Sequence, residues 1–110
     1  MHAAVAAEAV ADKPLVDRVI EDHTTAPISD KLRATLTFLK KLTLEPAEVR
    51  AADARAVLDQ GVSRQAMRDA IYICFIFCIY DRIADVLDWD VPSSEALHAN
   101  ARMLVKIGYR

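Results

Sequence analysis

Two cysteines stand out among the residues that are able to do chemistry. Cys74 and Cys78 are four residues apart, so on a helix they share one face. Their Cβ atoms would lie ~5–6 Å apart, and a disulfide needs about 3.8 Å, so the two thiols can join only where the helix unwinds. Two thiolates at this spacing can bind a metal, but four ligands are usual and no paired Cys or His motif lies nearby. The plainer interpretation is that both are small apolar core residues.

A polar group follows the apolar run that holds the cysteines. It consists of Tyr80, Asp81, Arg82 and Asp85. Asp81 and Asp85 are like-charged at a spacing of four, which mildly destabilises a helix unless a cation intervenes. Arg82 is spaced to reach Asp85 or a neighbouring helix. The group is either a polar cluster at the mouth of a pocket or a solvated helix end with one structural ion pair.

Several function classes find no support in the sequence. There is no glycine-rich phosphate loop, G-x-S-x-G or H-E-x-x-H, and no cofactor or metal site is indicated. The net charge of −2 is spread along the chain, which argues against nucleic-acid binding. The longest uncharged run, residues 70–80, is far shorter than the ~20 residues that span a bilayer. We therefore expect no membrane partner. Because two cysteines do not make a disulfide framework, we expect a reducing, cytoplasmic location.

The elements that position these residues are predicted to be helices. Two glycines, four prolines and frequent Ala and Leu favour an all-α fold with one domain over residues 1–110. Helical periodicity, with Ser29, Ser63 and Ser93 as N-caps, predicts five to six helices. They cover residues 3–11, a segment opening at Pro14, a segment after Ser29, 47–60, 64–89, and a segment after Ser93.

The predicted helix over residues 64–89 is apolar on every side in its middle. Such a helix must be surrounded, either by the bundle or by an oligomer interface. Because 54% of the residues are hydrophobic, the chain has more apolar surface than one small core hides. We therefore expect a homo-oligomer.

Two stretches resemble the AhpD-like (alkylhydroperoxidase / carboxymuconolactone decarboxylase) family, in particular its peroxidase-related members. Residues 27–43 with Glu45-Pro46 resemble the segment "A-P-L-S…L…F…K-L-T…P". Residues 61–63, 69–72 and 77–85 resemble the helix "G-V-S…D-A-I…F-N-x-x-(D/N)-R-x-A-D". The resemblance covers most of residues 2–92 and implies an AhpD-like helical bundle, commonly assembled as a homo-oligomer.

The resemblance also implies a chemistry. Family members carry C-x-x-C-x-x-x-H, whose cysteine pair is oxidised by a hydroperoxide and re-reduced by a dithiol partner. The alanine-rich stretch after the motif histidine resembles the residues after His2, which places His2 at that histidine and the cysteine pair before Met1. Cys74 and Cys78 are no replacement, since they lie on a later helix with C-x₃-C spacing, and Cys78 stands where the family has Asn. We expect an N-terminally truncated domain with little or no peroxidase activity.

Three functional hypotheses remain open at this point. The chain is a piece of a longer thiol-dependent antioxidant oxidoreductase, or a non-catalytic oligomeric helical interaction module. The third hypothesis is an apolar-ligand binder or thiol enzyme built around Cys74, Cys78, Tyr80 and Asp81.

Overall fold

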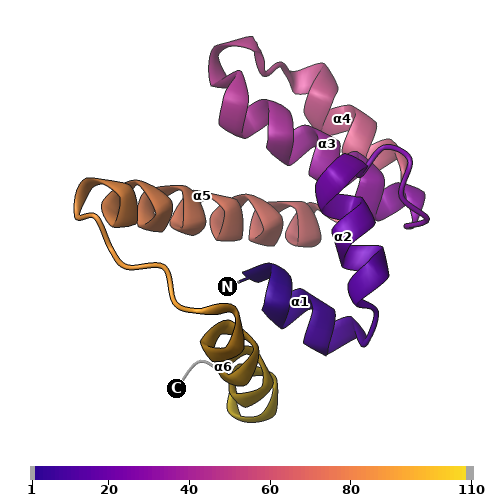
Figure 1. The fold of residues 1–110 in the computed structure, drawn as a ribbon. Helices are drawn as coiled ribbons and strands as arrows, with labels where there is room; N and C mark the ends of the chain where they lie inside the picture. Colours follow the sequence, from indigo (N-terminus) through magenta and orange to yellow (C-terminus); the bar gives the residue numbers. More distant parts are fainter. Residues whose placement is uncertain (1, 109–110) are drawn as a thin grey trace. The chain divides into compact units, whose positions relative to one another are not determined.

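The computed structural model describes residues 2–108, and in this part of the chain every regular element is a helix, with no strand (Figure 1). Six α-helices and one 3₁₀ turn follow in the order α1 (His2–Val10), α2 (Lys13–Asp22), α3 (Asp30–Leu44), η1 (Pro46–Glu48), α4 (Ala51–Asp59), α5 (Arg64–Val86) and α6 (Ser94–Ile107). The predicted all-α class with five to six helices is confirmed.

The helices belong to two compact units. Unit 1 combines residues 2–27 with residues 90–108, and unit 2 comprises residues 28–89. In unit 1, α1 packs against α2 and α6, and Ala101 of α6 is fully buried. In unit 2, α3, α4 and α5 pack against one another, and η1 packs on α3. That residues 1–110 form a single domain stays a prediction.

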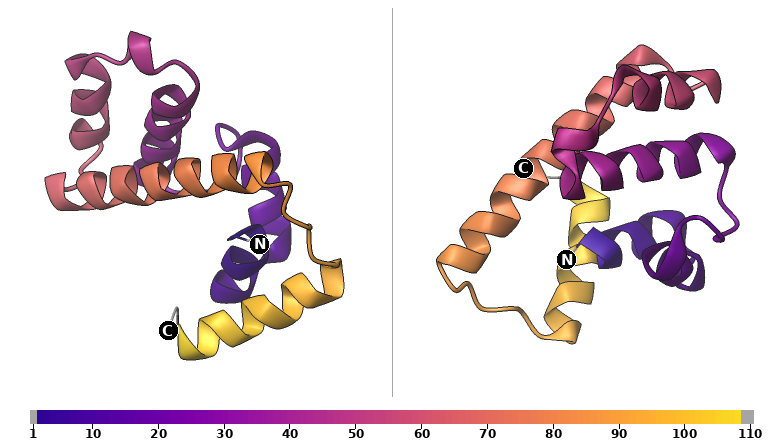
Figure 2. Two further views of the ribbon diagram at one scale, coloured as in Figure 1. Left: turned by 90° about the vertical axis from the view of Figure 1, so that its left-hand side faces the viewer. Right: turned by 90° about the horizontal axis from the view of Figure 1, so that it is seen from above.

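Unit 2 has a small apolar core where its three helices meet. Phe38 of α3, Val57 of α4 and Met67 of α5 are buried together, with Val57 only 2% exposed. Partly buried side chains pack around them, namely Leu39, Leu42, Val49, Ala54, Leu58, Val62 and Ile71. Figure 2 shows α3 and α4 side by side against the N-terminal part of α5, while the C-terminal half of α5 extends past them. That half therefore receives little cover from α3 and α4.

The predicted N-caps hold the helix starts. The hydroxyls of Ser29, Ser63 and Ser93 accept hydrogen bonds from backbone N–H groups three residues on, at 3.2, 3.0 and 3.3 Å. Each cap satisfies a donor that the first turn of a helix cannot pair internally. Gly61 follows α4 with φ +83°, the left-handed conformation in which a glycine commonly ends a helix.

Two predicted boundaries were wrong. Residues 47–60 do not form one helix, because Pro46 opens only the short turn η1 and Val49 is extended. The helix α4 starts at Ala51, where the Asp53 carboxylate accepts the backbone N–H of Arg50 at 2.7 Å. This local capping bond fixes the start four residues later than predicted.

The long helix ends at Val86 rather than at residue 89. Asp88 takes the left-handed conformation with φ +50°, and the N–H of Trp89 bonds back to the Ala84 carbonyl at 3.0 Å. This pattern is a helix stop that normally uses glycine or asparagine. An aspartate in that place gives the sequence no clear stop signal, although its short polar side chain tolerates the conformation.

Candidate functional site

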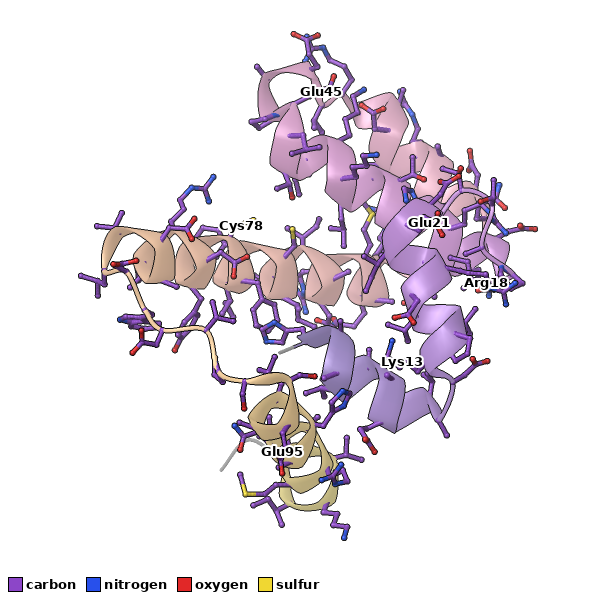
Figure 3. All side chains as sticks on the ribbon, in the orientation of Figure 1. Lys13, Arg18, Glu21, Glu45, Cys78 and Glu95 are labelled. Atoms are coloured by element: carbon purple, nitrogen blue, oxygen red, sulfur yellow. The ribbon has the colours of Figure 1, made fainter. Side chains whose placement is uncertain are left out.

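The two cysteines lie on the face of α5 that meets α3. Both are partly buried free thiols. The hydroxyl of Thr43, near the end of α3, lies 3.3 Å from Cys74 Sγ and 4.0 Å from Cys78 Sγ. Cys78 is visible on α5 in Figure 3, on the side of the helix toward α3. The spacing of four thus brings both sulfurs to one hydroxyl across the helix interface.

These sulfurs border a groove of about 350 Å³ between α3, η1 and α5. We call it the thiol groove, and its lining residues are Leu42, Thr43, Pro46, Ile71, Cys74, Phe75, Cys78 and Arg82. Apart from Thr43, Arg82 and the two thiols, the lining is hydrocarbon. Arg82 donates from Nη1 to the Cys78 carbonyl at 2.9 Å, which holds its guanidinium close to the groove. The groove therefore combines two soft sulfur atoms, one hydroxyl and one fixed positive charge.

The structure does not gather the other predicted site residues here. Tyr80, Asp81 and Asp85 are exposed and do not line the thiol groove. Within residues 2–108, Arg82 forms no ion pair with either aspartate, and its guanidinium bonds to the helix backbone instead. Of the predicted polar group, only Arg82 joins the cysteines.

His2 belongs to a different part of the molecule. It opens α1 in unit 1, while Cys74 and Cys78 are in unit 2. Its predicted place at the histidine of a peroxidase motif stays a prediction.

The opposite side of α5 is apolar and exposed. We define the outer face as Tyr72, Ile76, Ile79 and Ile83 with the flanking Ile73, Tyr80, Val86 and Leu87, which are 41–83% exposed. The four central residues are spaced i, i+4, i+7 and i+11, which places them in one stripe along the helix. Of the two predicted surroundings of this helix, α3 and α4 of the bundle cover the cysteine side only, and an oligomer interface on the outer face stays a prediction.

A concavity of about 550 Å³ lies between α3 and α4, and no pattern in the sequence predicted it. Lys41 donates to both carboxylate oxygens of Asp53 at 2.8 and 2.9 Å. The pKa of the Asp53 carboxyl is lowered below its ordinary 3.8 mainly by the hydrogen bonds from Lys41, and the hydrogen bond from the backbone N–H of Arg50 is the second cause. Lys41 and Asp53 are twelve residues apart, so no short-range sequence pattern predicts that they pair. Because the charges of Lys41 and Asp53 pair with each other, this ion pair connects α3 to α4 and does not indicate a ligand site.

We expect Asp53→Asn to destabilise unit 2 at neutral pH and to have little effect in acid. Because the pKa is lower in the folded state than in the unfolded chain, the carboxylate stabilises the fold at pH values above 3.8. That contribution is lost as the pH falls from there through the folded pKa. Asparagine still caps α4 but cannot pair with Lys41. Urea unfolding from neutral to acidic pH checks this, with the exposed Asp59→Asn on the same helix as control. A gap between wild type and Asp53→Asn that persists at low pH would contradict the ion-pair explanation.

Comparison with known proteins assigns no family. No family model matches the chain, and no curated protein or solved structure resembles it significantly. Among residues 2–108, no helix has the length and apolarity to cross a membrane. The AhpD-like resemblance thus stays a prediction.

Proposed function

We propose that this chain is a non-catalytic helical module of AhpD-like type that associates with a second copy of itself through the outer face of α5. The observation that carries the proposal is the uninterrupted apolar stripe on that face. The chain contains only Cys74 and Cys78, and neither belongs to a C-x-x-C motif. Self-association is therefore better supported than peroxide chemistry. With both thiols free, the module suits a reducing compartment, and the proposal places it in the cytoplasm.

The size of the outer face fits a dimer interface. An aromatic side chain such as tyrosine offers roughly 150–250 Å² and an aliphatic one somewhat less, and the eight residues of the face are about half exposed. The face thus offers on the order of 800 Å² of mostly apolar surface, more than the roughly 300–600 Å² of the largest patch on a typical monomer. Stable complexes bury about 800 Å² on each partner. One copy of the face is large enough to pair with another.

The charges at the two ends of α5 favour an antiparallel pair. Residues 64–69 carry Arg64, Arg68 and one aspartate, for a net charge of +1. Residues 81–88 carry three aspartates and Arg82, for a net charge of −2. An antiparallel two-fold arrangement brings the positive end of each helix to the negative end of the other, and the helix dipoles are opposed in the same favourable way. A parallel pair would place like charges together.

The first test is the mass of the purified chain in solution over about a hundredfold range of concentration. We expect sedimentation velocity to show a reversible dimer, with twice the 12.2 kDa of the chain. A monomer over the whole range would overturn the proposal. In that case strong protection of the α5 aromatic rings from solvent quenchers would indicate that another part of the same chain covers the face.

The orientation has a separate test. A two-fold axis at the centre of the stripe, between Ile76 and Ile79, sets Tyr72 of one copy opposite Ile83 of the other. In a background in which Cys74 and Cys78 are serine, Tyr72→Cys and Ile83→Cys chains should form a mixed disulfide when combined. Each variant alone should cross-link poorly. Efficient cross-linking of each variant with itself would indicate a parallel pair and contradict the charge argument.

A further inference from the structure

The thiol groove lies on the opposite side of α5 from the outer face and needs an explanation of its own. Both cysteines of the chain converge there on one hydroxyl, at 3.3 and 4.0 Å. A pair of purely structural apolar residues does not require this arrangement. We propose that Cys74 and Cys78 bind one soft monovalent cation of the Cu(I) type through two sulfur ligands. This inference is independent of the dimer.

The spacing of the cysteines suits a bridging ion better than a disulfide. On a regular helix their Cβ atoms lie ~5–6 Å apart, and a disulfide needs about 3.8 Å. Metal–thiolate bonds of about 2.3 Å each allow one ion to join two sulfurs up to ~4.6 Å apart. The helix α5 is continuous from Arg64 to Val86, so a bridging ion requires only side-chain rotation, whereas a disulfide requires the helix to break.

The number and type of ligands select the ion. Among residues 2–108, no group of three or more His, Cys, Asp or Glu side chains comes together. Zinc, which normally takes four such ligands in structural sites, would be left incomplete here. Cu(I) and its analogue Ag(I) are soft ions that prefer thiolates and accept two sulfur ligands in line. The groove therefore favours a monovalent soft ion over a divalent one.

The charge of the groove agrees with this choice. Binding replaces two S–H bonds with two S–Cu bonds, releases two protons, and transfers no electron. The product, S–Cu–S, carries one negative charge. The guanidinium of Arg82, held by its bond to the Cys78 carbonyl, supplies one positive charge at the groove. Leu42, Pro46 and Ile71 form hydrocarbon walls beside this charge.

The test is an anaerobic titration of the full, reduced chain with Cu(I) in competition with a chromophoric Cu(I) chelator. We expect one ion per chain and no displacement by Zn(II). Cys74→Ser and Cys78→Ser should each weaken binding at least about 100-fold, since each removes one of two ligands, and Arg82→Gln about 10-fold. Met103→Leu, which removes an exposed thioether on α6, should leave the affinity unchanged. Alanine variants replace the serine variants if circular dichroism shows lost helix.

Several results would overturn the proposal. Single-cysteine variants that bind as tightly as the wild type would show that the two sulfurs do not act together. One ion per two chains would mean that the ion bridges two copies instead of binding within one chain. Repeating the titration on a chain with a disrupted outer face tests the metal site independently of the proposed dimer. A Cys74–Cys78 disulfide that forms under mild oxidation with full helix content would refute the distance argument and identify a redox pair instead.

Discussion

Phe38→Ala should cost unit 2 about 3–5 kcal/mol of unfolding free energy, the usual cost of removing a buried phenylalanine ring. Phe38 is 7% exposed and contacts α4 and α5 through Val57 and Met67, so its ring connects all three helices of the unit. The loss is a large part of the roughly 5–15 kcal/mol that stabilises a typical domain. Urea unfolding followed by the single tryptophan, Trp89 in unit 2, measures it.

A matched control lies on the same helix as Phe38. Leu44, at the end of α3, is 66% exposed, so Leu44→Ala should change stability by no more than about 0.5 kcal/mol. If Phe38→Ala does not fold, the milder Phe38→Leu should still show a lower urea midpoint than Leu44→Ala. Equal midpoints for the two sites would mean that the core of unit 2 lies elsewhere.

Ile76→Glu should raise the dissociation constant of the dimer at least about 1,000-fold, because each dimer would bury two unpaired charges, and one such charge alone costs roughly 3–5 kcal/mol. Ile76 is near the centre of the outer face and is 49% exposed in the single chain. Glutamate is a good helix former, so α5 should keep its helix content. Sedimentation velocity gives the dissociation constant, and circular dichroism checks the fold.

The control carries the same substitution at another exposed isoleucine. Ile20 on α2 is 65% exposed, and Ile20→Glu should leave the dimer intact. A dimer that survives Ile76→Glu would remove the outer face from the interface. A dimer that dissociates only with Ile20→Glu would place the interface on unit 1 instead. The Ile76→Glu chain also provides the monomer in which the thiol groove is titrated with Cu(I).

Local signals in the sequence were enough to predict most of the helices. The serine caps at Ser29, Ser63 and Ser93 bond to the residue three positions on, so these hydrogen bonds can be predicted from the local sequence. The predicted helix boundaries were wrong where a residue that is uncommon in that position starts or ends the helix. Asp88 takes the left-handed conformation after α5, where a helix end commonly has glycine, and Asp53 caps the start of α4.

The spacing of Cys74 and Cys78 determined that they share a helix face, because the helical repeat fixes this without any other element. Only the tertiary structure decided what that face meets, since Thr43 and Lys41 come close to Cys74 and Asp53 from more than ten residues away. It likewise decided that the apolar outer face stays uncovered by α3 and α4. Hydrophobicity shows that a face must be buried, but it carries no information about the partner that buries it.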